Sequence, residues 1–140
     1  MFTYVIALGS NIGDRSAHLD RAYLALSALG RILKCSKNLE TEPIGKADQL
    51  FLNAACLFES RLEPKQLMRS LLDIEASLGR IRTERWANRI IDLDIIMARD
   101  AEGQTIRMQS DELTLPHPEA AKRSFVLGPM REVCDWDVAN

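Results

Sequence analysis

Two aspartates interrupt the segment of the chain that is otherwise most typical of a buried β-strand, residues 90–97. The other residues of this segment are aliphatic, and most of them are β-branched. Because side chains alternate between the faces of a strand, Asp92 and Asp94 are predicted to share one face. The opposite face is predicted to carry Ile91, Leu93, Ile95 and Met97. An unpaired buried carboxylate destabilises a fold by an amount on the order of several kcal/mol, so this pair is expected to meet a cation, either a metal ion or an arginine.

The residues that lead into this strand are rich in arginine. Arg80, Arg82, Arg85 and Arg89 fall close together in the sequence and are interleaved with Trp86. An Asp-x-Asp sequence alone is more often a pair of solvated carboxylates than a metal site, so this neighbourhood is what carries the prediction. Two acids on a rigid strand beside a basic loop suit a polyphosphate, because the acids can hold Mg²⁺ while the metal and the guanidinium groups share the phosphate oxygens.

Length, charge and cysteine content narrow the class of protein. The 140 residues predict one domain, residues 1–140, with a core of its own. A formal net charge of −2 argues against a general nucleic-acid-binding protein, which needs a basic face. Cys35, Cys56 and Cys134 are widely spaced, so neither a disulfide framework nor a zinc site is predicted. Residues 1–8 lack the features of a signal peptide or membrane span, and we expect a cytoplasmic protein without a membrane partner.

Hydrophobic periodicity predicts four strands separated by two helices. The first helix is expected to begin near an N-cap at Ser16 and to end at Gly30. The second is expected to begin at Pro64, to end at Gly79 and to carry Glu75 on its polar side, near the arginine-rich segment. The strands are predicted at residues 3–8, 32–39, 51–59 and 90–97.

This order of elements, βαββαβ, predicts a ferredoxin-like α+β sandwich with an antiparallel sheet. Both helices are expected on one face of the sheet and the active site on the other, where Asn53 would join the two aspartates. Residues 100–104 are predicted to turn a C-terminal hairpin whose return strand includes residues 106–108. A short helix containing Lys122 and Arg123 is expected to follow, with Phe125 just after it.

Several motifs together resemble one known family. Residues 85–96, with the sequence RWANRIIDLDII, resemble the signature of hydroxymethyl-dihydropterin pyrophosphokinase. Other segments resemble family motifs in the family's order: residues 7–11, 41–45, 51–55, 74–80 and 115–117, followed by Arg123 and Phe125. The resemblance covers nearly the whole chain. It implies an ATP-dependent diphosphotransferase of folate biosynthesis, which moves the β,γ-diphosphate of ATP to the hydroxymethyl group of 6-hydroxymethyl-7,8-dihydropterin and releases AMP.

The resemblance also implies roles for individual residues and a set of ligands. Two Mg²⁺ ions would be held by Asp92 and Asp94 and would bridge the phosphates of ATP, the co-substrate. The implied catalytic residues are Arg80, Arg89, Asp92 and Asp94. The implied ATP contacts are Glu75, Arg82, His117 and Arg123. The implied pterin contacts are Asn11, Thr41, Phe51, Asn53, Trp86, Asp92 and Phe125. The expected enzyme is a monomer whose partners are these two small molecules and not a nucleic acid.

Two positions depart from the family pattern, and two other readings of the chain stay open at this point. Asn88 stands where the family usually has proline, and Pro118 follows His117 where some members have an aromatic residue.

The same features also fit a ferredoxin-like module that binds an anion or RNA without catalysis. They also fit a different Mg²⁺-dependent transferase that uses Asp-x-Asp. Release of AMP would distinguish the pyrophosphokinase from both.

Overall fold

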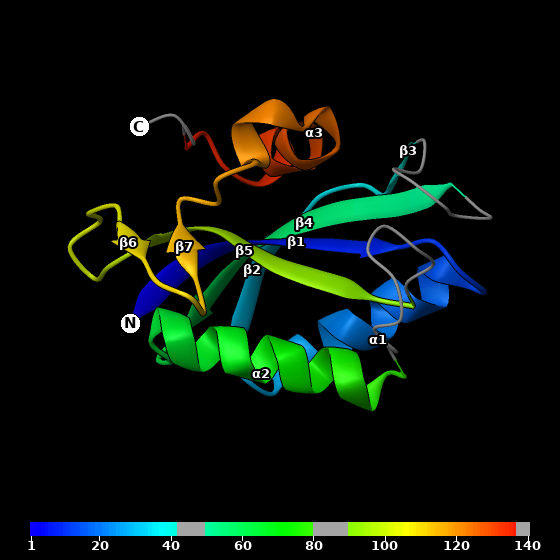
Figure 1. Ribbon diagram of the computed structural model, residues 1–140, viewed down its shortest axis with the longest axis horizontal. Helices are drawn as coiled ribbons and strands as arrows, with labels where there is room; N and C mark the ends of the chain where they lie inside the picture. The colour runs from blue at the N-terminus through cyan, green and yellow to red at the C-terminus, as the bar shows by residue number, and fades with distance from the viewer. Residues whose placement is uncertain (42–49, 80–89, 137–140) are drawn as a thin grey trace.

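The computed structural model describes residues 1–41, 50–79 and 90–136 (Figure 1). The arginine-rich segment 80–89 therefore lies outside the described residues, as do residues 42–49 and 137–140. The elements occur in the order β1 (Phe2–Ser10), α1 (Arg15–Ser27), β2 (Arg31–Cys35), β3 (Leu39–Thr41), β4 (Phe51–Ser60), α2 (Pro64–Ser77), β5 (Asp92–Arg99), β6 (Met108–Gln109), β7 (Thr114–Leu115), a 3₁₀ turn (Ala120–Lys122) and α3 (Ser124–Val133).

The main sheet is antiparallel, with the strand order β2-β4-β1-β5. This is the order of a ferredoxin-like sheet, and the predicted α+β sandwich is confirmed. The predicted strand at residues 32–39 is in fact two strands, β2 and β3, and both pair with β4. Figure 1 shows α1 and α2 together on one face of the sheet and α3 on the other.

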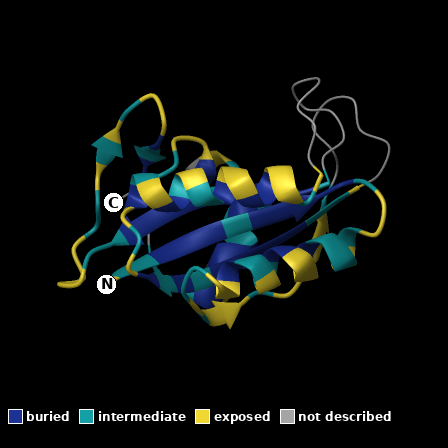
Figure 2. Cartoon of the chain, turned by 90° about the horizontal axis from the view of Figure 1, so that it is seen from below, coloured by how far each residue is buried: buried dark blue, intermediate teal, exposed yellow. Residues whose placement is uncertain are grey.

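The face covered by α1 and α2 holds the larger part of the core. Every second residue of β1 points into it, and the inward residues of both helices are buried. Figure 2 shows the two helices, exposed on their outer sides, in front of a largely buried sheet. Burying one such Leu or Ile side chain contributes about 1.5–3 kcal/mol, so this layer is the main source of stability. Its largest fully buried members are Tyr4, Ile6, Leu8, Leu19, Leu26, Phe58, Leu67, Leu71, Ile91, Leu93 and Ile95.

Both helices begin at capped residues. The N-cap of α1 is Asp14, whose side chain accepts a hydrogen bond of 3.1 Å from the Ala17 amide, so the predicted cap at Ser16 is wrong by two residues. In α2 the predicted start is confirmed, with proline in the first turn and a reciprocal capping box between Glu63 and Gln66. Within the described residues, we find no helix with the length and apolar character that crossing a bilayer requires.

The described residues cover the second face of the sheet only in part. Helix α3 packs Val126 and Met130 against Val5, Ile96 and Met97, which form a separate apolar cluster. The predicted short helix around Lys122 and Arg123 is wrong in its bounds: a 3₁₀ turn ends at Lys122, and α3 begins at Ser124 with Phe125 inside it. The rest of this face, near the ends of β3, β4 and β5, is the part that is left for a binding site.

A β-bulge changes the phase of β5. Ile6 pairs with Ile95, but the preceding residue of β1, Val5, pairs with Met97, so Ile96 is the extra residue. Up to Ile95 the side chains alternate as predicted. Beyond the bulge the alternation restarts, which places Met97 in the cluster under α3. The prediction that Met97 shares a face with Ile95 is therefore wrong.

The C-terminal hairpin is also arranged differently from the prediction. The turn at residues 100–104 is present, closed by the Asp100 amide, which donates to the Gln104 carbonyl over 2.9 Å. The chain then returns beside β5 for two residues, with Thr105 opposite Arg99 and the Ile106 amide donating to the Ala98 carbonyl. The strand at residues 108–109, however, pairs with β7 and not with β5.

Candidate active site

A pocket opens on the uncovered face of the sheet, and its floor is formed by small residues of β1. Gly9 and Ala7 line it. In the register of the sheet, Gly9 lies directly between Asn53 on β4 and Asp92 on β5, and Ala7 is opposite Asp94. The two outer strands are separated by two strand spacings, about 10 Å. The floor is therefore flanked by an amide on one side and by carboxylates on the other.

The absence of a side chain at Gly9 is what keeps the floor open. A Cβ atom there would lie 3.1 Å from Asn53 Oδ1 and 3.6 Å from Cδ1 of the Phe51 ring. The amide oxygen and the ring edge thus both lie over the glycine, and any larger residue would occupy the space between them. Sequence reasoning did not identify Gly9 as part of the site, although a glycine inside a strand is a known signal of close approach.

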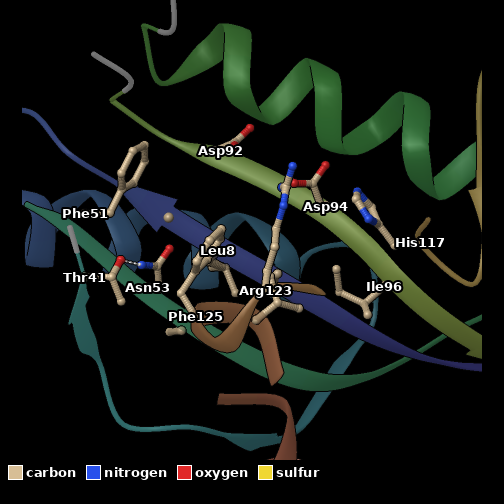
Figure 3. A pocket seen from close by; sticks show the side chains of 14 residues that line it. Leu8, Thr41, Phe51, Asn53, Asp92, Asp94, Ile96, His117, Arg123 and Phe125 are labelled. Carbon is tan, nitrogen blue, oxygen red and sulfur yellow. Dashed lines mark hydrogen bonds between the residues drawn. The ribbon is translucent and has the colours of Figure 1, made fainter. Parts of the chain in front are cut away.

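Asp92 and Asp94 form one wall of the pocket. Both line it from β5, and Figure 3 shows the two side chains on the same side of the strand. The prediction that they share one face is confirmed, because they precede the bulge in β5. We call these two residues the acid wall.

The acid wall is supported from behind by α2. The buried Glu75 carboxylate accepts a hydrogen bond of 2.7 Å from the amide of Leu93, the residue between the two aspartates. The expectation that Glu75 lies on the polar side of its helix is wrong. It is on the inward side, four residues after the buried Leu71, because an amide of the edge strand β5 needs an acceptor there.

The opposite wall combines polar and aromatic side chains. Thr41 at the end of β3, and Phe51 and Asn53 at the start of β4, line this side. The Asn53 amide nitrogen donates to the Thr41 hydroxyl over 2.6 Å, which leaves the Asn53 amide oxygen on the side of Gly9. Figure 3 shows this bond, with the Phe51 ring beside it. We call Thr41, Phe51 and Asn53 the ring wall, because an amide edge and an aromatic face suit a flat heterocycle.

Two residues from the segment between β7 and α3 also enter the pocket. The His117 amide donates to the Ile96 carbonyl over 2.8 Å, and His117 Nδ1 accepts from the Glu119 amide over 3.2 Å. Burial lowers the pKa of His117, as does the nearby Arg123 guanidinium, while Glu119 and Asp92 act in the opposite direction. The ring is therefore neutral at pH 7, and since Nδ1 is an acceptor, Nε2 carries the proton and can donate.

Arg123 brings a positive charge to the middle of the pocket. Its guanidinium carbon lies 5.7 Å from the centroid of the Phe125 ring, within the range of a cation–π contact. Figure 3 shows its side chain extending across the pocket toward Asp94. Phe125 lines the pocket from the first turn of α3. A planar guanidinium group in this place can bind phosphate oxygens.

A second hollow adjoins the pocket and shares two of its residues, Asp94 and His117. Its other walls come from Met68 on α2, from Ile95 on β5 and from residues 110–114 and 118. Asp94 and His117 therefore stand between two adjoining spaces. This arrangement allows two different ligands to meet at the acid wall.

Some residues expected at the site are not on the pocket lining. Asn11 is completely buried just after β1, and Glu75 lies beneath β5. Arg80, Arg82, Trp86 and Arg89 lie outside the described residues. Of the expected site residues, the structure brings these together around the pocket: Thr41, Phe51, Asn53, Asp92, Asp94, His117, Arg123 and Phe125.

The acid wall fits a magnesium ion that is bound together with a phosphorylated substrate. In the part of the chain that the structure describes, no group of three or more His, Cys, Asp or Glu side chains is placed to hold a metal by itself. Mg²⁺ prefers oxygen ligands, keeps several waters and commonly uses one or two carboxylates plus substrate phosphates. Two carboxylates facing an open pocket meet that requirement, whereas a structural metal would need a closed ligand set.

Comparison with family models and comparison with curated proteins both match the chain to the same family. The family model for 7,8-dihydro-6-hydroxymethylpterin-pyrophosphokinase (HPPK) matches residues 5–135. The chain is 40% identical over 132 residues to 2-amino-4-hydroxy-6-hydroxymethyldihydropteridine pyrophosphokinase of Bacillus subtilis, covering 92% of this chain and 76% of that protein. It is also 40% identical to the enzyme of the same name from Methylorubrum extorquens, covering 91% of this chain and 80% of that protein.

Two longer proteins contain a matching part. The chain is 39% identical to the Bifunctional protein FolKE of Lactococcus lactis, of which it spans 39%. A crystal structure of HPPK-DHPS in complex with substrates superimposes with a TM-score of 0.67 and covers 99% of this chain. The chain spans 41% of that protein, and the identity is 12%, so this likeness concerns the fold alone.

Proposed function

The chain belongs to the 7,8-dihydro-6-hydroxymethylpterin-pyrophosphokinase family, and we propose how its pocket performs the reaction of that family. The enzyme is a pyrophosphokinase of folate biosynthesis: it transfers the β,γ-diphosphate of ATP to the hydroxymethyl group of 6-hydroxymethyl-7,8-dihydropterin and releases AMP. The observation that supports the residue assignments is the placing of the acid wall and the ring wall on either side of one glycine-floored pocket.

In this proposal the pterin binds at the ring wall. Its flat ring lies between Phe51 and Phe125, which line the same pocket, and its polar edge meets the Asn53 amide oxygen and the Thr41 hydroxyl. Stacking of this kind contributes about 0.5–1.5 kcal/mol per aromatic pair beyond the area that is buried. Gly9 gives the ring access to the sheet, because this residue has no side chain of its own between the Asn53 amide and the Phe51 ring.

The triphosphate of ATP is proposed to lie along the acid wall. Two Mg²⁺ ions are assigned to Asp92 and Asp94, where they would neutralise the charge that develops on the phosphate oxygens. His117 offers its Nε2–H to a phosphate oxygen, and Arg123 offers its guanidinium group. The nucleoside end is assigned to the second hollow, which shares Asp94 and His117 with the pocket.

With both substrates bound, the chain's main contribution is alignment. The hydroxymethyl oxygen of the pterin attacks the β-phosphorus and loses its proton to solvent, the bond from that phosphorus to the oxygen of the α-phosphate breaks, and AMP leaves. Holding the attacking oxygen, phosphorus and leaving oxygen in line removes most of the entropic cost of the step. The fixed distance between the ring wall and the acid wall supports this role.

Other assignments remain proposals that rest on family membership. Arg80, Arg82 and Arg89 are proposed to bind phosphate oxygens, Trp86 to cover the pterin, and Asn11 to act near the pterin. Glu75 is proposed to act by holding Leu93 between the two aspartates, and no direct contact with ATP is assigned to it. The three cysteines are free, which supports a reducing compartment such as the cytoplasm, and the enzyme is proposed to act as a monomer.

Product analysis tests the proposal. The protein is incubated with ATP, Mg²⁺ and 6-hydroxymethyl-7,8-dihydropterin, and nucleotides are separated by chromatography. We expect AMP and a pterin diphosphate in equal amounts, with no AMP when either the pterin or Mg²⁺ is omitted. Formation of ADP would indicate transfer of a single phosphoryl group. ATP binding that is independent of Mg²⁺, without any product, would indicate an anion-binding module instead.

A further inference from the structure

Arg15, the first residue of α1, connects two segments of chain that enter the ring wall. Its Nη2 atom lies 2.7 Å from Glu40 Oε1, and its Nη1 atom donates to the Leu50 carbonyl oxygen over 2.6 Å. Glu40 immediately precedes Thr41, and Leu50 immediately precedes Phe51. One guanidinium group therefore binds the residues next to two members of the ring wall.

The register of the sheet shows why these bonds act on the pocket. Thr41 and Phe51 are direct partners at the end of the β3–β4 ladder. Because side chains alternate, Thr41 faces the pocket and Glu40 faces the side of the sheet on which α1 begins. A strand of three residues has few ladder bonds of its own, so a side-chain bond to its middle residue, Glu40, has a large share in fixing its position.

The geometry of Arg15 differs from that of an ordinary surface ion pair. Arg69 gives both its Nε and Nη2 donors to one carboxylate, that of Glu112, and its side chain is 61% exposed. Arg15 divides its donors between a carboxylate and a backbone carbonyl of another segment, and its side chain is 21% exposed. The rigid fork of an arginine can hold two acceptors in a fixed relation, which a lysine cannot do.

We propose that Arg15 is a positioning residue for pterin binding: it holds Thr41 and Phe51 in the places that the ring wall requires. This inference rests on the proposed function of the pocket. Arg15 touches neither substrate in this proposal, and it acts through the two segments that it connects. Removing it should therefore weaken use of the pterin and leave use of ATP nearly unchanged.

Steady-state kinetics of Arg15→Ala test the inference, with AMP release as the signal. We expect the KM for the pterin to rise on the order of tenfold, while the KM for ATP changes by less than about twofold. The matched control is Arg21→Ala, which removes an arginine from the same helix that contacts His18. Both variants should melt within a few degrees of wild type, because Arg15 holds only the end of the β3–β4 ladder, outside the core, and Arg21 makes an exposed contact.

Two further variants sharpen the result. Arg15→Lys keeps the charge but can serve both acceptors only poorly, so its pterin KM should fall between those of wild type and Arg15→Ala. Glu40→Gln removes the charge of one acceptor and leaves the bond to Leu50, so its effect should be the smallest of the three. If Arg15→Ala fails to fold, the other two variants carry the test: the pterin KM of Arg15→Lys should then be higher than that of Glu40→Gln. Equal increases in both KM values, or none in the pterin KM, would overturn the inference.

Hydrogen exchange separates this inference from the proposed function. In Arg15→Ala the amides of residues 39–41 and 51–53 should exchange faster, while those of β5 should exchange as in wild type. A wild-type protein that releases no AMP would refute the proposed function, whatever the exchange shows. A wild-type protein that is active, together with unchanged exchange at residues 39–41 in the variant, would refute the role of Arg15 alone.

Discussion

The acid wall and the ring wall of the pocket are supported in different ways. Asp92 and Asp94 lie on a strand of eight residues that pairs with the central strand β1, and the amide between them is bound by a buried carboxylate. Thr41 ends a strand of three residues, where its own hydroxyl accepts from Asn53 and its neighbour Glu40 accepts from Arg15. The carboxylates of the site thus both lie on one long strand joined to β1, whereas the recognition surface depends in part on a strand of three residues, β3, that supplies Thr41.

Removing a carboxylate from the acid wall should have the largest effect. Asp94→Ala is expected to lower kcat/KM about 10³-fold or more, because the transition-state charge loses a metal ligand. The melting temperature should hold or rise, because one of two neighbouring like charges is gone. Asp92→Ala should behave in the same way, and Asp20→Ala on the exposed side of α1 is the control. A variant of the acid wall that no longer folds would mark the pair as structural.

Loosening the support behind the acid wall should have the next largest effect. Glu75→Ala leaves the Leu93 amide without its acceptor, which should lower the free energy of unfolding by about 1–3 kcal/mol. Turnover should fall about tenfold, because small shifts of Asp92 and Asp94 disturb the alignment of the phosphates. Glu75→Gln keeps an oxygen acceptor, so its losses should be smaller. We expect this for the free energy of unfolding, measured by urea unfolding, and for turnover, measured as kcat. An alanine variant that unfolds early yet turns over normally would show that the wall does not depend on this bond.

Filling the floor should affect the ring wall more than the acid wall. Gly9→Ala places a Cβ 3.1 Å from Asn53 Oδ1, so the amide must move by a few tenths of an ångström. We expect the KM for the pterin to rise several-fold, roughly 1 kcal/mol of binding, with the KM for ATP unchanged. Gly128→Ala is the control, since its Cβ would make an ordinary contact of 3.8 Å with Leu39. An equal change in both KM values would mean that the two walls are not separate.

The smallest predicted effect concerns pH. The pKa of His117 is lowered in the folded protein, so the unfolded chain binds the proton more readily. His117 therefore contributes nothing to the pH dependence of stability at high pH, and it destabilises the fold as pH falls below about 6.5, the ordinary value. His117→Gln should remove this part of the pH dependence in urea unfolding between pH 8 and pH 5, with His18→Gln as the control. An unchanged pH dependence in His117→Gln would contradict the predicted direction.

Periodicity was sufficient to predict the parts of the fold that are dominated by apolar contacts. The strand with the two aspartates, the strand β4 and the start of α2 all follow from local patterns. Helix α3 was underestimated because Pro129, which lies inside it, normally argues against a helix. The bulge at Ile96 leaves no mark in a run of aliphatic residues, and so the place of Met97 could not be predicted.

Within the site, the residues that line the pocket were easier to predict than the residues that hold them in place. Asp92, Asp94 and Asn53 attract notice because polar residues in apolar strands need partners. The spacing of four residues from Leu71 places Glu75 on the inward side of α2, but the charge of Glu75 suggests the solvent side. Its hydrogen-bond partner is the backbone amide of Leu93, which is distant in the sequence, so no local pattern indicates it. Arg15 carries no sequence signal of its role, since both its acceptors are brought to it only by the folded sheet.

The position of β1 between the two walls has a further consequence. The span from Asn53 on one wall to Asp92 on the other is set by the main-chain hydrogen bonds that join β4 and β5 to β1 on either side of Gly9. Substitutions on one wall can therefore change which ring or which anion binds there. They would leave the distance between the two bound ligands unchanged. An engineer could treat the walls as independent modules on a constant frame.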